Sequence, residues 1–96
     1  MEITRFVQLS FSEEYLEQFI QSFETKRKQI LSYEGCLEVV LYTDVQKKGL
    51  CFTVSTWSSE QALSKYRQSE WFLSTWSQIK EHFTDKPAAW TTQKNH

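Results

Sequence analysis

The sequence has few of the residues that interrupt or cross-link a chain: two glycines, one proline and two cysteines among 96 residues. No apolar run approaches the roughly 20 residues of a membrane-spanning helix, and the opening residues MEITRFVQ lack the charged-then-apolar layout of a signal peptide. We therefore expect a cytoplasmic protein without a membrane partner. Cys36 and Cys51 form neither a CxxC pair nor a zinc-ligand cluster, so we expect reduced, inert buried thiols and no metal site.

The sequence also lacks an excess of positive charge. Eleven Lys and Arg stand against twelve Asp and Glu, which gives a net charge of −1. The basic residues are scattered, apart from clusters at 26–28 and 47–48, and the first cluster falls late in a predicted helix, where cations complement the helix dipole. Because a nucleic-acid interface needs a concentrated positive face, we expect no nucleic-acid partner.

Aromatic residues are abundant: seven Phe, four Trp and four Tyr make up 16% of the chain. At this length we expect a single domain over residues 1–96 with a modest core, so much of the core volume must be aromatic. The segment SEWFLSTWSQIKEHF, residues 69 to 83, concentrates four of these side chains, namely Trp71, Phe72, Trp76 and Phe83.

The first half of the chain reads as a strand, a helix and a hairpin. Residues 3–11 alternate between apolar and polar as in a half-buried strand, with Arg5 interrupting the apolar set. Ser12 is placed to cap a helix that runs to about Ser32 with one apolar stripe. After Gly35, the segments 36–44 and 50–57 flank a polar turn and predict an antiparallel hairpin.

The second half predicts two helices and a last strand. Ser58 and Gln61 have the spacing of a capping box, and Ser69 begins a third helix. Phe72, Trp76, Ile79 and Phe83 share one stripe of that helix, whereas Trp71 lies outside it and is expected to be an exposed or interface aromatic. Pro87 ends the helical region, and residues 88–94 form the final strand.

The order β-α-β-β-α-α-β predicts an α+β ferredoxin-like sandwich, in which helices cover one face of a four-stranded antiparallel sheet. Both phases of each strand carry apolar side chains. The uncovered face, which we expect to include Val40, Tyr42 and Trp57 or their neighbours in the other phase, therefore needs a second layer. A second copy of the chain can supply it, so we predict a homodimer with the sheets face to face.

Three segments, YEGC (33–36), TWSSEQALSKYRQSEWF (56–72) and KPAAW (86–90), resemble the antibiotic biosynthesis monooxygenase domain family. The resemblance implies a dimeric α/β barrel with a cleft between the helices and the sheet of each subunit. In the quinone-forming branch the implied substrate is a small electron-rich phenol or a polycyclic anthrone, oxygen is the oxidant, and neither metal nor flavin is used.

The haem-degrading branch of the superfamily requires an Asn, a Trp and an iron-ligating His. The corresponding positions in this chain hold Val7, Tyr66 and Trp76. All three required residues are missing, so we do not expect haem degradation.

The resemblance and the side-chain chemistry together suggest a site. Tyr66 and Arg67 would orient a phenolate and His82 would act as general base, while a small aromatic molecule would contact Trp57, Phe72, Trp76 and Phe83. Four of these residues also have a structural interpretation: Tyr66 and Trp76 as core, Arg67 as a surface or dimer contact, and His82 as a partner of helix-end carbonyls. The alternative function is a non-catalytic dimeric domain that binds a small hydrophobic ligand or only dimerises.

Overall fold

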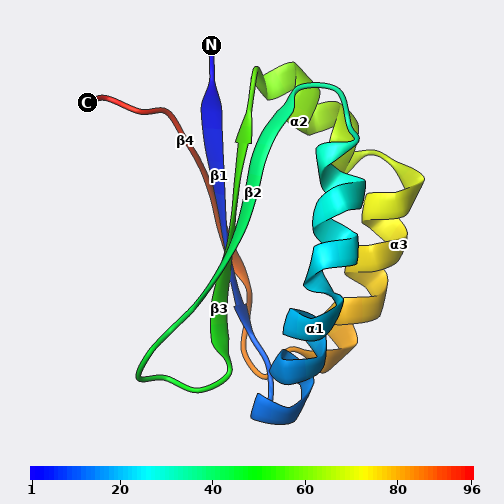
Figure 1. Ribbon diagram of the computed structural model, residues 1–96, viewed down its shortest axis with the longest axis vertical. Helices are drawn as coiled ribbons and strands as arrows, with labels where there is room; N and C mark the ends of the chain where they lie inside the picture. The colour runs from blue at the N-terminus through cyan, green and yellow to red at the C-terminus, as the bar shows by residue number, and fades with distance from the viewer.

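The computed structural model describes residues 1–96 as one sheet with helices on one side (Figure 1). The elements are β1 (Ile3–Ser10), α1 (Glu13–Leu31), β2 (Cys36–Thr43), β3 (Leu50–Trp57), α2 (Glu60–Arg67), α3 (Glu70–Ile79), a 3-10 turn (Lys80–His82) and β4 (Ala88–Thr92). This order confirms the predicted β-α-β-β-α-α-β arrangement. No helix is both long enough and apolar enough to cross a lipid bilayer.

The helix starts follow from side-chain caps, and one predicted cap is wrong. The hydroxyls of Ser12 and Ser69 accept the backbone N–H groups of Tyr15 and Phe72, as their positions predict. The cap of α2 is Ser59 rather than Ser58, since the Ser59 hydroxyl accepts the N–H of Ala62. Ser58 instead donates its backbone N–H to the Gly35 carbonyl, 2.8 Å away.

The third helix is shorter than its aromatic stripe suggests. It ends at Ile79, and the chain continues through the 3-10 turn into Phe83, whose backbone is extended. Phe83 forms an isolated antiparallel bridge with Phe11, so the end of the first predicted strand joins this segment rather than the sheet. Phe83 therefore contacts the core from a loop and not from α3.

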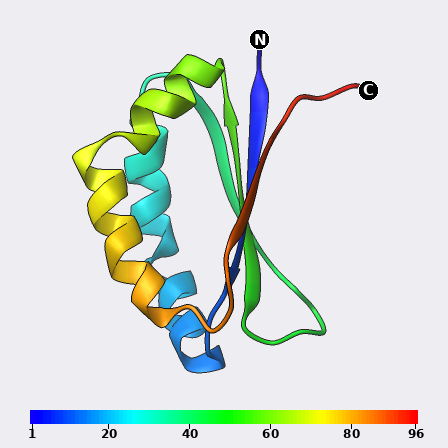
Figure 2. The same cartoon turned by 180° about the vertical axis from the view of Figure 1, so that it is seen from behind.

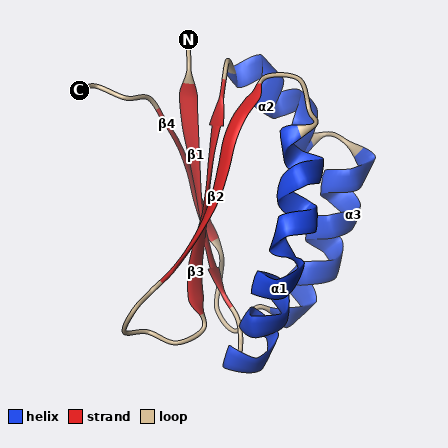
Figure 3. Ribbon diagram, viewed as in Figure 1, coloured by secondary structure: helices blue, strands red, loops and turns tan.

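The four strands are antiparallel in the order β2-β3-β1-β4, with the last strand beside the first as predicted. All helices lie on one face of this sheet, and the other face has no helix over it (Figure 3). Phe6 of β1 lies opposite Val54 of β3 and Trp90 of β4, and Val54 lies opposite Val40 of β2. One apolar row therefore crosses the uncovered face from edge to edge.

Val40 and Tyr42 lie on the uncovered face as expected, but Trp57 does not. Trp57 shares the phase of Cys51 on β3 and is fully buried on the helix-covered side. A β-bulge between Cys36 and Glu38 shifts the β2 register opposite Trp57.

Buried side chains form two clusters under the helices. The larger joins strand residues to α1 and the end of α3 and consists of Leu9, Phe11, Leu16, Phe19, Phe23, Val39, Cys51 and Ile79. The smaller lies under α2 and consists of Ile3, Trp57, Leu63 and Tyr66. In the two opposite views α3 lies farther from the sheet than α1 does (Figures 1 and 2).

Candidate functional site

A cavity of about 480 Å³ lies between α3 and the sheet. Residues of both core clusters border it, and 15 of its 22 lining residues are hydrophobic. Its size and its apolar walls are in the range of pockets that bind small organic molecules. This cavity corresponds to the cleft that the family resemblance implies.

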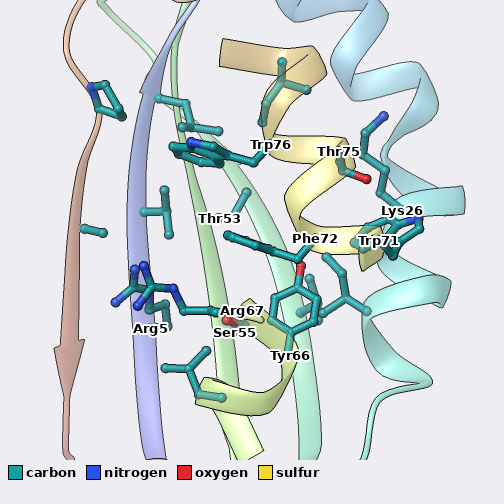
Figure 4. Close-up of a pocket in the computed structure, with 18 of the residues that line it drawn as sticks. Arg5, Lys26, Thr53, Ser55, Tyr66, Arg67, Trp71, Phe72, Thr75 and Trp76 are labelled. Atoms are coloured by element: carbon teal, nitrogen blue, oxygen red, sulfur yellow. The ribbon is translucent and has the colours of Figure 1, made fainter. Parts of the chain in front are cut away.

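One wall of the cavity is aromatic and comes from α3. Phe72 and Trp76 are one helical turn apart, with nearly parallel rings whose centroids are 6.1 Å apart. Both reach from α3 toward the strands (Figure 4). Trp76 is supported from behind by Phe83, whose ring meets it edge-on at 5.4 Å.

Trp71 also borders the cavity, contrary to the expectation that it is only an exposed or interface aromatic. It is half-buried, lies 6.3 Å from Tyr66 and 6.5 Å from Tyr33 between ring centroids, and points toward α1 near Lys26 (Figure 4). It thus closes the gap between α3 and α1.

Tyr66 brings a polar group into this apolar surface. Its ring is held between Trp57, at 5.0 Å, and Phe72, which meets it edge-on at 5.1 Å. Its hydroxyl points toward Phe72 among the cavity residues (Figure 4), takes part in none of the side-chain hydrogen bonds within the protein, and is not sealed away from solvent. Burial raises the pKa of Tyr66 far above its usual value, and Tyr33 and Cys36 raise it further. The hydroxyl therefore stays protonated and can donate a hydrogen bond, but it cannot serve as a base near neutral pH.

The sheet forms the opposite wall, in which Arg5, Thr53 and Ser55 lie among apolar residues. Arg5 on β1 lies opposite Ser55 on β3 and Thr91 on β4, and its Nη1 donates to the Thr91 Oγ1 at 2.9 Å. The Ser55 Oγ accepts the Trp57 Nε1–H at 2.9 Å. Thr53, next along the same face of β3, also borders the cavity. The sheet wall therefore offers hydroxyls and a guanidinium where a core would otherwise be apolar.

Arg67 and Lys26 add positive charge at the edges of the cavity. Arg67 is exposed at the end of α2, and Figure 4 shows its side chain beside Arg5. Lys26 reaches the cavity from α1, where its Nζ donates to the Ser22 Oγ at 2.9 Å and lies 5.6 Å from the centre of the Phe19 ring. Burial lowers the pKa of Lys26 from its usual value.

Four of the seven residues predicted for the site therefore share the cavity: Tyr66, Arg67, Phe72 and Trp76. Trp57 lies behind Tyr66, fully buried and out of the lining. Phe83 packs edge-on against Trp76 and is also absent from the lining. His82 is exposed in the 3-10 turn, where its ring stacks on Tyr15 with centroids 3.8 Å apart and also lies outside the lining.

Three polar residues of the cavity were missed by that prediction, although the strand pattern of the sequence distinguishes them. Arg5, Thr53 and Ser55 interrupt the core-facing phase of their strands, where apolar residues are expected. A polar residue in such a phase must find a partner or line a cavity. The pattern does not predict that the pairing of β1 with β3 places these polar residues side by side.

The lining contains neither His nor Cys. Val7 and Trp76, the residues that the resemblance assigned to the Asn and the iron-ligating His of the haem-degrading branch, both border the cavity. Neither can ligate iron, so the residues present do not fit a haem site of that kind. No three His, Cys, Asp or Glu side chains gather where they could hold a metal ion.

Comparison with known proteins gives one family match. Residues 3–78 match the family model described as antibiotic biosynthesis monooxygenase. No curated protein sequence matches the chain.

Many solved structures share the fold. A conserved protein from Methanosarcina mazei has a TM-score of 0.88 at 16% identity, over 99% of this chain and 94% of that chain. Rv0793 from Mycobacterium tuberculosis has a TM-score of 0.86 at 16% identity, over 100% of this chain and 97% of that chain. A structure described as an antibiotic biosynthesis monooxygenase has a TM-score of 0.85 at 15% identity, over 98% of this chain and 99% of that chain. At such identities the likeness establishes the fold alone.

Proposed function

The chain belongs to the antibiotic biosynthesis monooxygenase family, and we propose that it is a cofactor-independent monooxygenase that oxidises a small aromatic or polycyclic phenol with O2. The observation that carries this proposal is the cavity of about 480 Å³, which combines an aromatic wall on α3 with the free hydroxyl of Tyr66. Flat apolar rings fit such walls, and the few polar groups can orient them.

The proposed reaction is a four-electron oxidation in which the substrate is the only electron donor. For an anthrone, loss of a proton gives an electron-rich anion that transfers electrons to O2. One oxygen atom becomes the new ring carbonyl, and the other leaves as water with the two hydrogens of the oxidised carbon. The protein must hold the ring, stabilise the anion and limit the access of water.

Tyr66 and Arg67 have complementary roles in this proposal. Tyr66 donates a hydrogen bond to the substrate oxygen on which negative charge develops, and burial keeps its proton in place. Arg67 is a permanent cation at the same end of α2 and favours the anionic substrate by charge. Phe72 and Trp76 hold the ring system against the strands.

No base is assigned within the cavity. His82 was the predicted base, but its exposed position on Tyr15 lies outside the lining. Phenols and anthrones are acidic enough to lose a proton to water near the opening once a cation stabilises the anion. If His82 accepts a proton in this reaction, it does so from the protein surface and not from within the cavity.

The experiment that tests the proposal is oxygen uptake by the purified, metal-free protein with hydroquinones, naphthols and anthrones. We expect uptake above the uncatalysed rate with at least one ring class, accompanied by quenching of the Trp71 and Trp76 fluorescence. Tyr66→Phe should reduce the uptake, whereas Tyr15→Phe, which removes a hydroxyl outside the cavity, should not. Quenching without oxygen uptake would instead support the alternative, a dimeric domain that binds a small hydrophobic ligand without chemistry.

We also propose a homodimer. The apolar row Phe6, Val54, Val40 and Trp90 crosses a sheet face without helices, and Tyr42 and Trp90 on that face are 56% and 49% exposed. An exposed apolar face of this extent favours burial against an equivalent face. Both cysteines are free thiols, which suits the cytoplasm.

A further inference from the structure

The cavity carries three cations and no acid. Arg5, Lys26 and Arg67 are among its 22 lining residues, and none of these residues is Asp or Glu. The whole chain has a net charge of −1, so this positive surface is local and does not follow from composition. Such a site attracts anions and repels cations.

Arg5 and Arg67 form a pair without an acidic partner. Both line the cavity, Figure 4 draws both side chains at its sheet side, and they are close enough for the charge of Arg67 to act on Arg5. Burial lowers the pKa of Arg5, and the charge of Arg67 lowers it further. Glu60 shares a neighbouring surface hollow with Arg67, but the ion pairs of the protein lie elsewhere, between Arg27 and Glu24 and between Lys48 and Glu13.

Two neighbouring guanidinium groups repel each other, and partial burial strengthens the repulsion because less water screens it. An anion between them removes this cost and gains charge-assisted hydrogen bonds. The planar fork of a guanidinium matches the two oxygens of a carboxylate. Arg5 is already oriented by its hydrogen bond to Thr91, so little side-chain freedom is lost on binding.

We propose that the ligand of this cavity carries a carboxylate on its aromatic ring system, and that Arg5 and Arg67 bind this carboxylate. The proposal rests on the proposed function in taking the same cavity as the ligand site. It adds a substrate class, the aromatic or polycyclic hydroxy acids, and a binding residue, Arg5, that belongs to β1 rather than to the helices.

The placement of Tyr66 and Arg67 supports two separate polar contacts with the ligand. They are consecutive residues of α2, so their side chains diverge by about 100° around the helix axis. Tyr66 points toward Phe72, whereas Arg67 reaches toward Arg5 on the sheet (Figure 4). The phenolic oxygen and the carboxylate therefore occupy different ends of the ligand, with the rings along Phe72 and Trp76 between them.

A carboxylate fits better than a phosphate. Sites for phosphate groups commonly use backbone N–H groups of glycine-rich loops or helix N-termini. Neither Gly35 nor Gly49 borders the cavity, and the first turns of α2 and α3 both carry a Glu. Side-chain guanidinium groups are the donors that remain.

The test compares ligands that keep one ring system and one hydroxyl and differ in the group at the opposite end. Calorimetric titration would use 6-hydroxy-2-naphthoate, its neutral amide 6-hydroxy-2-naphthamide, and 6-hydroxy-2-naphthyl phosphate. The protein variants would be Arg5→Gln and Arg67→Gln, with Lys48→Gln as the matched control, because Lys48 is a cation outside the cavity. Circular dichroism would establish that each variant keeps its helices.

We expect the carboxylate to bind at least tenfold more tightly than the amide, and less tightly as salt increases. Arg5→Gln and Arg67→Gln should each lower the affinity for the carboxylate by tenfold or more and change the affinity for the amide by less than threefold. Lys48→Gln should change neither affinity. Equal affinities of the carboxylate and the amide, equal losses for both in the variants, or no binding of either would overturn the proposal. Tighter binding of the phosphate would overturn the carboxylate assignment.

Oxygen uptake separates this proposal from the proposed function. Tight, arginine-dependent binding of the carboxylate without oxygen uptake would sustain the anion site and argue against the monooxygenase. Oxygen uptake that is equally fast with 2-naphthol and with 6-hydroxy-2-naphthoate, at equal affinities, would sustain the monooxygenase and overturn the anion site.

Discussion

The ring of Tyr66 stacks on the indole of Trp57, with centroids 5.0 Å apart and an angle of 28° between the planes. Trp57 is fully buried and is fixed further by its hydrogen bond to Ser55. A residue of the core thus positions a residue of the cavity. The predicted contact of Trp57 with a ligand is replaced by an indirect role, in which Trp57 sets the direction of the Tyr66 hydroxyl.

The first prediction separates the hydroxyl of Tyr66 from its ring. Tyr66→Phe keeps the contacts with Trp57 and Phe72 and removes only a group without a protein partner. The melting temperature should therefore stay within about 2 °C, since 1 kcal/mol corresponds to several degrees at this size. Turnover of a phenol substrate should fall on the order of a hundredfold, as for loss of one donor to a developing oxyanion.

Steady-state oxygen uptake and thermal unfolding measure these two effects. Tyr15→Phe is the control, because Tyr15 packs on Phe11 and His82 outside the cavity. A large loss of stability in Tyr66→Phe with unchanged turnover would make Tyr66 a structural residue only.

The second prediction concerns Trp57 itself. Trp57→Ala should lower the free energy of unfolding by about 3 to 5 kcal/mol, because it empties a large buried volume. Leu73→Ala is the control: Leu73 is 56% exposed, so its loss should cost on the order of 0.5 kcal/mol. Urea unfolding followed by circular dichroism measures both values. A small effect of Trp57→Ala would contradict its place in the core.

The fold could be predicted from the sequence because each element carries a local signal. Alternation marks the strands, and Ser12 and Ser69 mark helix starts, each through a hydroxyl that caps the first turn. Where two residues could serve equally, the local signal was insufficient: Ser58 and Ser59 are adjacent, and the approach of the chain to Gly35 decides which one caps α2. The end of α3 was misplaced because Phe83 keeps the helical spacing without the helix.

The site was harder to predict, because it depends on contacts between elements. The aromatic wall follows from helical spacing, which places Phe72 and Trp76 on one side of α3. Nothing local tells whether such a stripe packs tightly or borders a cavity, since that depends on how far α3 lies from the sheet. Arg5 is informative in retrospect: a charge within an apolar phase indicates a strand position that faces a cavity.

The third prediction is a loss of stability in alkaline solution. Burial raises the pKa of the Cys51 thiol from 9.0 to about 11. The unfolded thiol loses its proton near pH 9, whereas the folded one keeps it to about pH 11, so the stabilising difference is complete below pH 9 and is lost as pH rises toward 11. The loss is at most roughly 3 kcal/mol, because one pKa unit corresponds to about 1.4 kcal/mol.

Urea unfolding between pH 8 and 11 measures this loss. Cys51→Val is the matched variant, because valine fills a similar volume and does not titrate. The unfolding free energy of the wild type should fall more steeply between pH 9 and 11 than that of Cys51→Val. Parallel curves would mean that the thiol is not held in a desolvated site.

The fourth prediction concerns the uncovered sheet face. The wild-type protein should have a mass of about 23 kDa in solution, twice that of the 11.5 kDa chain. Phe6 lies in the middle of the apolar row, opposite Val54 and Trp90. Phe6→Glu places a charge there that a second sheet would have to desolvate, so the variant should be a monomer that retains its helices.

Light scattering coupled to size-exclusion chromatography measures the mass, and circular dichroism measures the helices. Thr25→Glu, an equally large change of charge on the exposed side of α1, is the control and should stay a dimer. A wild-type mass of one chain at micromolar concentration would contradict the dimer. A folded Phe6→Glu variant that remains dimeric would place the interface elsewhere, because a buried, unpaired carboxylate in the middle of the row is too costly to tolerate.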